Sequence, residues 1–126
     1  MILRDLTPQL LVSDWARSIE FYTGVLGFTL DGLWPQDKPD WCMLDHGNVH
    51  IMCTTEAHEG PPHFTGKLAL HTDDVMAVFE RVNGRAKLVY GPEVYHYGMK
   101  EFAIEDPDGY MLSFSQPTDE PPTCTE

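Results

Sequence analysis

The chain has 126 residues, enough for one compact domain, and its hydrophobic fraction of 42% supports an ordinary packed core. Its 20 acidic and 8 basic residues give a net charge of −12, which repels phosphate backbones and anionic membrane surfaces. No apolar run is long enough to span a bilayer. We therefore expect neither nucleic-acid binding nor membrane association.

Two further features bear on the compartment. The N-terminal residues lack the basic region and apolar stretch of a signal peptide. The three cysteines, Cys42, Cys53 and Cys124, form an odd and sparse set without a close pair in sequence, which argues against a disulfide scaffold or a zinc knuckle. We expect a reducing, cytoplasmic environment.

The first half of the chain predicts a strand, a helix and three more strands. A short apolar run over residues 9–13 is followed by Asp14, a natural N-cap for a helix whose apolar residues recur three or four positions apart. Gly24 and Gly27 mark the end of this helix. The expected elements after it are a strand over 28–33, a loop over 34–40, and a hairpin of strands 41–44 and 49–54.

The second half repeats this order after a linker. Residues 56–65, with a glycine and two prolines, show no periodicity and predict the linker. The expected elements are a strand over 67–72, a helix capped by Asp74, a strand over 87–90, a loop over 91–98, and strands 100–105 and 110–115 around the turn 106–109. Residues 117–126 are rich in proline, threonine and acid, and we expect a flexible acidic tail.

The two halves superimpose at an offset of 60 residues, which indicates a duplication. This offset relates the two cap aspartates and also pairs Gly24 with Gly84 and Phe28 with Leu88. We therefore expect an α+β fold of two tandem modules, about 7–55 and 66–116, each with a strand, a helix and three further strands.

The predicted strands have one apolar face and one mixed face. Neighbouring residues of a strand point to opposite sides of a sheet, so Leu10, Ile51 and Leu112 belong to the apolar face that packs on the helices. The mixed face carries glutamine, histidine, methionine, lysine and serine, a composition closer to a half-closed ligand cavity than to a solvated surface. An ordinary exposed sheet surface is the alternative.

Two segments resemble a known family. The stretch LLVSDWARSIEFYTGVLGF (10–28) looks like the opening helix of the glyoxalase/bleomycin-resistance/dioxygenase superfamily, also called vicinal oxygen chelate proteins. The stretch YGMKEFAIEDPDGYMLSFSQP (97–117) resembles its closing strands. The resemblance implies two tandem βαβββ modules that form a curled mixed sheet around a cleft, with the helices on the outer face, and a homodimer. It leaves function open, because members of one fold differ in chemistry.

Metal-dependent members of this superfamily hold a divalent ion with histidine, glutamate or glutamine on inward positions of four strands. Carried over to this chain, those positions fall on Thr7, Lys67, Ser113, and either His50 or Met52. A lysine ammonium repels a cation, and a single imidazole does not hold a catalytic ion. We therefore predict no metal and no other cofactor. A divalent metal belongs to the alternative hypothesis of an altered site formed by His50, His71 and Glu101.

The site candidates come from the mixed face and the adjoining loops. Lys67 would bind an anionic group or form an ion pair with Glu101, and aromatic rings near strand ends, Trp34 and Tyr95 among them, would stack on a flat ligand. The ligand-binding candidates are Gln9, Trp41, His50, Met52, Lys67, His71, Tyr97, Glu101 and Ser113. The catalytic residues are unknown, with His50 and Glu101 as candidates.

Three functional hypotheses remain at this stage. The first is a metal-free protein that binds a small organic molecule and resembles the bleomycin-resistance branch. The second is a metal-dependent lyase, isomerase or dioxygenase with an altered ligand set. The third is a structural or partner-binding role.

Overall fold

The computed structural model describes residues 1–56, 63 and 66–124. They fall into two compact units, Met1–Pro62 and His63–Glu126. The expected linker lies mostly at 57–62 and 64–65, outside the described residues. In the described part, no helix is both long and apolar enough to cross a membrane.

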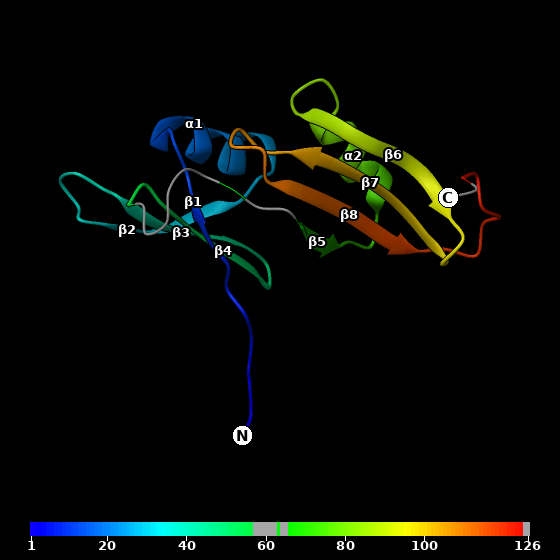
Figure 1. Ribbon diagram of the computed structural model, residues 1–126, viewed down its shortest axis with the longest axis horizontal. Coiled ribbons are helices and arrows are strands. Elements are labelled where there is room, and N and C mark those ends of the chain that lie inside the picture. The colour runs from blue at the N-terminus through cyan, green and yellow to red at the C-terminus, as the bar shows by residue number, and fades with distance from the viewer. Residues whose placement is uncertain (57–62, 64–65, 125–126) are drawn as a thin grey trace. The chain divides into compact units, whose positions relative to one another are not determined.

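Unit 1 is a four-stranded sheet with one helical segment (Figure 1). Its strands pair in the order β1-β4-β3-β2, with β1 parallel to β4 and the other neighbours antiparallel. The elements in chain order are β1 (Gln9–Leu11), α1 (Trp15–Glu20), the π-helix η1 (Phe21–Val25), β2 (Thr29–Trp34), β3 (Trp41–His46) and β4 (Val49–Thr54).

Unit 2 repeats this topology, with strand order β5-β8-β7-β6 and β5 parallel to β8. Figure 1 shows α2 lying across β7 and β8, the two strands that it contacts. The elements are β5 (Lys67–His71), α2 (Val75–Val82), β6 (Lys87–Tyr95), β7 (Met99–Glu105) and β8 (Met111–Pro117). The predicted α+β fold of two tandem βαβββ modules is confirmed, and the described strands form two open mixed sheets rather than a closed barrel.

Both helices begin at the predicted caps. Asp14 Oδ1 accepts a hydrogen bond from the Arg17 amide at 3.0 Å, and Asp74 Oδ1 accepts one from the Ala77 amide at 3.1 Å. Each carboxylate thereby satisfies one of the open amides of its first turn. The first helix then differs from the expectation, because after Glu20 it widens into η1.

The offset of 60 changes to 58 in the second strand of each unit and returns to 60 in the third. Leu30 pairs with Leu44 on β3 and Leu88 pairs with Ile104 on β7, so Leu30, not Phe28, is the equivalent of Leu88. Unit 1 places two more residues between helix and strand, in the stretch that holds η1. Gly24, which the offset pairs with Gly84, lies inside η1. Gly27 is the better match for Gly84, because both adopt a left-handed backbone, with φ of 79° and 80°.

The register of the second strand strengthens the case for duplication. Its pairing shifts between Leu30 and Gly32 in β2, and at the matching place between Leu88 and Tyr90 in β6. A register shift that recurs at the equivalent position in both copies belongs to the fold and is not a local irregularity.

The loop predicted over 91–98 is wrong over its first half, because β6 continues to Tyr95. The Gly-Pro pair at 91–92 was expected to end the strand, but it lies in a second register shift, between Tyr90 and Glu93, after which pairing with β7 resumes. Gly91 permits this because it adopts φ of 76°, where a side chain would be strained.

The apolar faces form the core of each unit. In unit 2, Phe102 stacks on Phe114 with ring centroids 5.2 Å apart, and Phe79 of α2 meets Phe102 edge-on at 5.3 Å. The buried apolar residues of unit 1 include Leu10, Val12, Tyr22, Cys42, Leu44, Ile51 and Cys53. The predicted division between a core face and a mixed face therefore holds in both sheets.

The turn at 106–109 and the segment after β8 both have defined hydrogen-bond partners. Asp106 is buried, and its Oδ1 accepts hydrogen bonds from the amides of Asp108 at 2.8 Å and Tyr110 at 2.9 Å, as a turn at 106–109 requires. The segment expected to be flexible is hydrogen-bonded to β6: the Thr123 amide donates to Val94 O at 2.8 Å, and the Val94 amide donates to Thr123 Oγ1 at 2.8 Å.

A pair of glycine substitutions tests the close approach at Gly91. A Cβ there would lie 2.3 Å from the Glu101 carbonyl oxygen, whereas one at Gly98, with φ of 78°, meets nothing within 4 Å. We expect Gly98→Ala to lower the free energy of unfolding by about 1–2 kcal/mol, the cost of a left-handed alanine. Gly91→Ala should lose roughly 1–3 kcal/mol more, because overpacking adds to that strain. Urea unfolding measures both, and equal losses would contradict the close approach.

Candidate functional site

The mixed face of unit 2 is not an ordinary solvated surface. On β7, residues of both faces are buried: Phe102 and Ile104 on the core face, Glu101 and Ala103 on the mixed face. Ser113, which pairs with Ala103, is buried as well. A glutamate that is only 5% exposed needs partners, since an isolated buried carboxylate is strongly destabilising.

Glu101 has three such partners, and together they form what we call the Glu101 cluster: Lys67, Tyr90, Tyr97 and Glu101. Lys67 Nζ lies 3.0 Å from Glu101 Oε2 and 3.0 Å from Tyr90 Oη. The Tyr90 hydroxyl donates a short hydrogen bond to the same Oε2, and the Tyr97 hydroxyl donates to Oε1 at 3.2 Å. Both carboxylate oxygens are therefore engaged. The ion pair anticipated for Lys67 and Glu101 is confirmed.

These contacts fix the charge state of the cluster. Burial would raise the pKa of Glu101, but the hydrogen bonds from Tyr90 and Lys67 outweigh it and hold that pKa below its usual range. The hydrogen bond with Tyr90, together with the one to Glu101, raises the pKa of Lys67 against the opposing effect of burial. At neutral pH the cluster thus contains one carboxylate and one ammonium that neutralise each other.

Aromatic rings extend the cluster at the end of β6. Tyr95 and Tyr97 stack nearly parallel, with an interplanar angle of 5° and centroids 5.5 Å apart. Burial raises the pKa of Tyr95 to about 12, so its hydroxyl stays protonated. Tyr97 remains 52% exposed. The stack therefore presents an accessible aromatic surface beside a neutralised polar cluster.

The other candidates of unit 2 lie outside this cluster. His71 Nδ1 is 3.3 Å from the Ser115 hydroxyl, with which it pairs across β5 and β8. Ser113 faces Ala69 and Ala103 on the neighbouring strands. Both residues share the mixed face with Glu101, and neither touches the carboxylate.

The four candidates of unit 1 lie on the mixed face of its own sheet. Gln9 is opposite Met52 across β1 and β4, and Trp41 is opposite Trp34 across β2 and β3. His50 Nδ1 lies 2.5 Å from Asp45 Oδ1, a contact that lowers the pKa of Asp45. The imidazole therefore has a carboxylate partner within its own hairpin.

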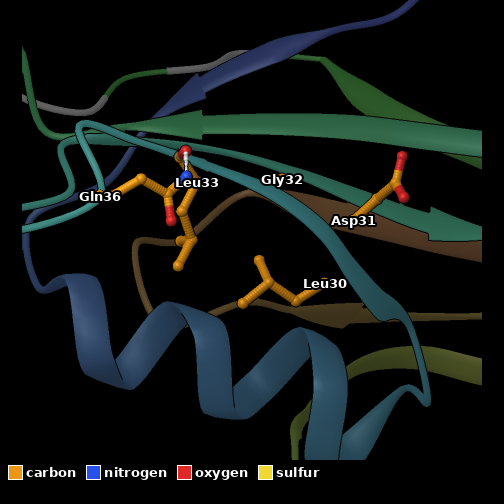
Figure 2. Close-up of a pocket in the computed structure, with 5 residues that line it drawn as sticks. All are labelled: Leu30, Asp31, Gly32, Leu33 and Gln36. Carbon is orange, nitrogen blue, oxygen red and sulfur yellow. Dashed lines mark hydrogen bonds between the residues drawn. The ribbon is translucent and has the colours of Figure 1, made fainter.

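A shallow hollow on unit 1 contains none of these candidates. It has a volume of about 240 Å³ and is lined by Leu30, Asp31, Gly32, Leu33 and Gln36. Figure 2 shows Leu30 and Leu33 on the side of β2 that faces the helix and Asp31 on the other side, with Gln36 hydrogen-bonded to the Leu33 carbonyl at 2.8 Å. It is smaller than a usual ligand pocket and lacks convergent polar groups.

The comparison with family models decides the classification. The model of the Glyoxalase/Bleomycin resistance protein/Dioxygenase superfamily matches residues 6–114. The chain belongs to this superfamily. No curated protein matches it.

Several solved structures share this fold. TnmS3, an antibiotic binding protein from Streptomyces sp. CB03234, is 25% identical with a TM-score of 0.78, over 94% of this chain and 99% of that one. TioX from Micromonospora sp. ML1 is 20% identical with a TM-score of 0.78, over 90% and 98%. A glyoxalase/bleomycin resistance protein/dioxygenase from Nocardioides is 17% identical with a TM-score of 0.71, over 100% and 92%.

The residues at the superfamily's metal positions do not fit a divalent ion. The register resolves the ambiguous fourth position, because Met52 pairs with Gln9 as Ser113 pairs with Ala69. Met52, and not His50, is therefore the equivalent of Ser113. The set of Thr7, Lys67, Met52 and Ser113 offers no carboxylate and no imidazole. Among the described residues, no three of histidine, cysteine, aspartate or glutamate could together hold a metal ion, so the set of His50, His71 and Glu101 gains no support.

Sequence reasoning missed two partners. Tyr90 was assigned to a strand but not to the site, because the strand was expected to end there. Asp45 was assigned to a turn, although the hairpin itself holds the signal: a two-residue turn at Gly47 and Asn48 places residue 45 opposite residue 50.

Removing Lys67 tests whether Glu101 depends on its ion pair, with removal of Lys87 as the control. Lys67→Met leaves a buried carboxylate with only tyrosine donors, and we expect a loss of about 1–3 kcal/mol at pH 7, discounted because Lys67 is half-exposed. The control is Lys87→Met, whose partner Glu105 lies 3.3 Å away in an exposed pair, and it should cost less than about 0.5 kcal/mol.

The effect of Lys67→Met should depend on pH. Because the pKa of Glu101 is lowered in the folded protein, its stabilising contribution is complete above the usual glutamate pKa and is lost as pH falls through the folded value. The gap between wild type and Lys67→Met should therefore narrow between neutral and acidic pH in urea unfolding. A gap that stays constant with pH would contradict the role assigned to the pair.

Proposed function

We propose that this protein binds a small, flat organic molecule with an aromatic ring on the mixed face of its sheets, without the metal site of its superfamily. The observation that carries the proposal is the parallel stack of Tyr95 and half-exposed Tyr97 beside the Glu101 cluster. A planar ring would extend this stack, and aromatic pairs contribute about 0.5–1.5 kcal/mol beyond the area they bury.

The charge states of the cluster favour binding over catalysis. A carboxylate whose pKa is lowered is a poor general acid, and both Glu101 oxygens already accept hydrogen bonds. An ammonium whose pKa is raised stays protonated, so Lys67 is neither a base nor a nucleophile. The cluster is thus suited to hold fixed hydroxyls and a neutral polar surface against a ligand.

The superfamily gives this proposal a precedent. TnmS3, which shares the fold and 25% of its aligned residues with this chain, is an antibiotic binding protein. We infer a ligand of the same broad kind, an antibiotic or another small organic molecule. The further contacts that we propose on unit 2 are Lys67, His71 and Ser113. Gln9, Trp41, His50 and Met52 stay ligand-binding candidates on the mixed face of unit 1. A homodimer stays a prediction from the resemblance, to be measured by size-exclusion chromatography with light scattering.

Thermal shift against a panel of planar aromatic antibiotics and aliphatic controls tests the proposal. We expect stabilisation by one or more aromatic compounds and none by the aliphatic set. For a compound that binds, Tyr97→Ala should weaken the affinity by about 3- to 10-fold in titration calorimetry. The matched control is Leu88→Ala on β6, a side chain of similar exposure at 45%, which should leave the affinity unchanged. No response to any compound, or equal effects of both substitutions, would contradict it.

The alternative is a metal-dependent lyase, isomerase or dioxygenase with an altered ligand set. Elemental analysis of the purified protein separates the two hypotheses. We expect less than stoichiometric nickel, zinc, iron and manganese, because the superfamily positions lack carboxylates and imidazoles. One equivalent of any of these metals, lost together with enzymatic turnover on chelation, would replace the binding proposal by the enzymatic one.

A further inference from the structure

Two cysteines that are far apart in sequence face each other directly in space. Cys42 on β3 and Cys53 on β4 are cross-strand partners, and both are fully buried on the core face of unit 1. The two residues are not close in sequence, and it is the pairing of β3 with β4 that brings them together.

The ladder gives the spacing of the pair. The Thr55 amide donates to the Asp40 carbonyl at 3.0 Å, which makes residues 40 and 55 a hydrogen-bonded pair of the antiparallel ladder. Such pairs alternate along the strands, so Cys42 and Cys53, two residues further along, are hydrogen-bonded as well. The Cα atoms of such a pair are about 5.5 Å apart. Disulfides most often bridge Cα atoms about 5.5–6 Å apart, so the Cα spacing fits. The Cβ atoms of a hydrogen-bonded pair are about 5–5.5 Å apart and must approach by about 1 Å to reach the spacing of a disulfide.

The side chains already meet. A hydrogen bond from the Cys53 thiol lowers the pKa of Cys42, against the opposing effect of burial. A thiolate is the reactive form of cysteine, and a resolving thiol adjacent to it is the usual arrangement for reversible oxidation. Cys42 is therefore the residue to react first and Cys53 the residue to resolve it.

We propose that Cys42 and Cys53 form an intramolecular disulfide when the protein meets hydrogen peroxide. The Cys42 thiolate attacks the peroxide oxygen, the O–O bond breaks, and with one proton the departing oxygen leaves as water while Cys42 becomes a sulfenic acid. The Cys53 thiol then attacks that sulfur, the S–O bond breaks, and the thiol proton leaves with the hydroxyl group as a second water. Two electrons pass from the two sulfurs to the peroxide.

Burial sets the rate of this reaction but does not prevent it. Both thiols are 0% exposed, so a peroxide reaches them only when the β3–β4 hairpin opens locally. Cys124 is partly exposed and gives an internal reference for an accessible thiol. The proposal does not depend on the proposed binding function, although β3 and β4 also carry the candidates Trp41 and Met52.

The experiment uses the full chain with Cys124→Ser, which removes disulfides between molecules through the accessible thiol. The protein is incubated with hydrogen peroxide, denatured, and alkylated with N-ethylmaleimide before intact mass measurement. After peroxide we expect no alkylation and a mass about 2 Da below that of the reduced, unalkylated protein. The sample without peroxide should carry two alkyl groups. Cleavage before Asp45 should leave the two cysteine peptides joined until a reductant is added.

Wild-type protein provides the second measurement, because it needs no substitution in the core. It should take up one alkyl group after peroxide, at Cys124, and three without it. In the Cys124→Ser background, Cys53→Ser should abolish the loss of about 2 Da and leave Cys42 alkylated or further oxidised. Two alkylations after peroxide treatment in Cys124→Ser, or a linkage that forms only between molecules, would overturn the proposal.

Discussion

The buried carboxylate of Glu101 is the constraint on which the mixed face of unit 2 depends. A charge so little exposed is stable only while Lys67 and the tyrosine hydroxyls surround it. Lys67 comes from β5, Tyr90 from β6 and Tyr97 from the turn after β6, so this carboxylate of β7 connects β5 with β6 across the sheet. The same contacts that stabilise it occupy its oxygens. Lys67, which falls on one of the superfamily's metal positions, is here the ion-pair partner of this carboxylate.

The two copies share the features that build the fold, but the described residues of unit 1 do not repeat the Glu101 cluster. The copies agree in strand order, in helix caps and in the bulge of the second strand, because each unit needs these features to fold. They differ on the mixed face. In unit 1, Trp41 takes the place that Glu101 has on β7. Glu101 pairs with Ser115, which ends the β5–β8 ladder, and Trp41 pairs with Thr54, which ends the equivalent β1–β4 ladder. One copy presents a neutralised polar cluster and the other an indole.

Much of this could be predicted from the sequence, because local signals dictated it. Asp14 and Asp74 precede apolar stripes of helical period, and the turn at 106–109 has its characteristic residues, so these elements follow from short-range chemistry. The ion pair of Lys67 and Glu101 could be anticipated as well. Tyr90 could not, because its role depends on how Gly91 carries the strand through a register shift. The facing of Cys42 and Cys53 depends on the position of a two-residue turn, which sequence spacing alone did not reveal.

The hydrogen bonds between the C-terminal segment and β6 have a consequence for association. β6 is an edge strand, and an unpaired edge offers its amides and carbonyls to any other extended chain. Thr123 occupies both the amide and the carbonyl of Val94, and its hydroxyl also donates to Glu93 Oε2 at 2.5 Å. The segment thereby caps part of this edge with irregular backbone that cannot propagate a sheet. Strand addition at this point of β6 is blocked, which protects the chain against the edge-to-edge pairing that leads to aggregation.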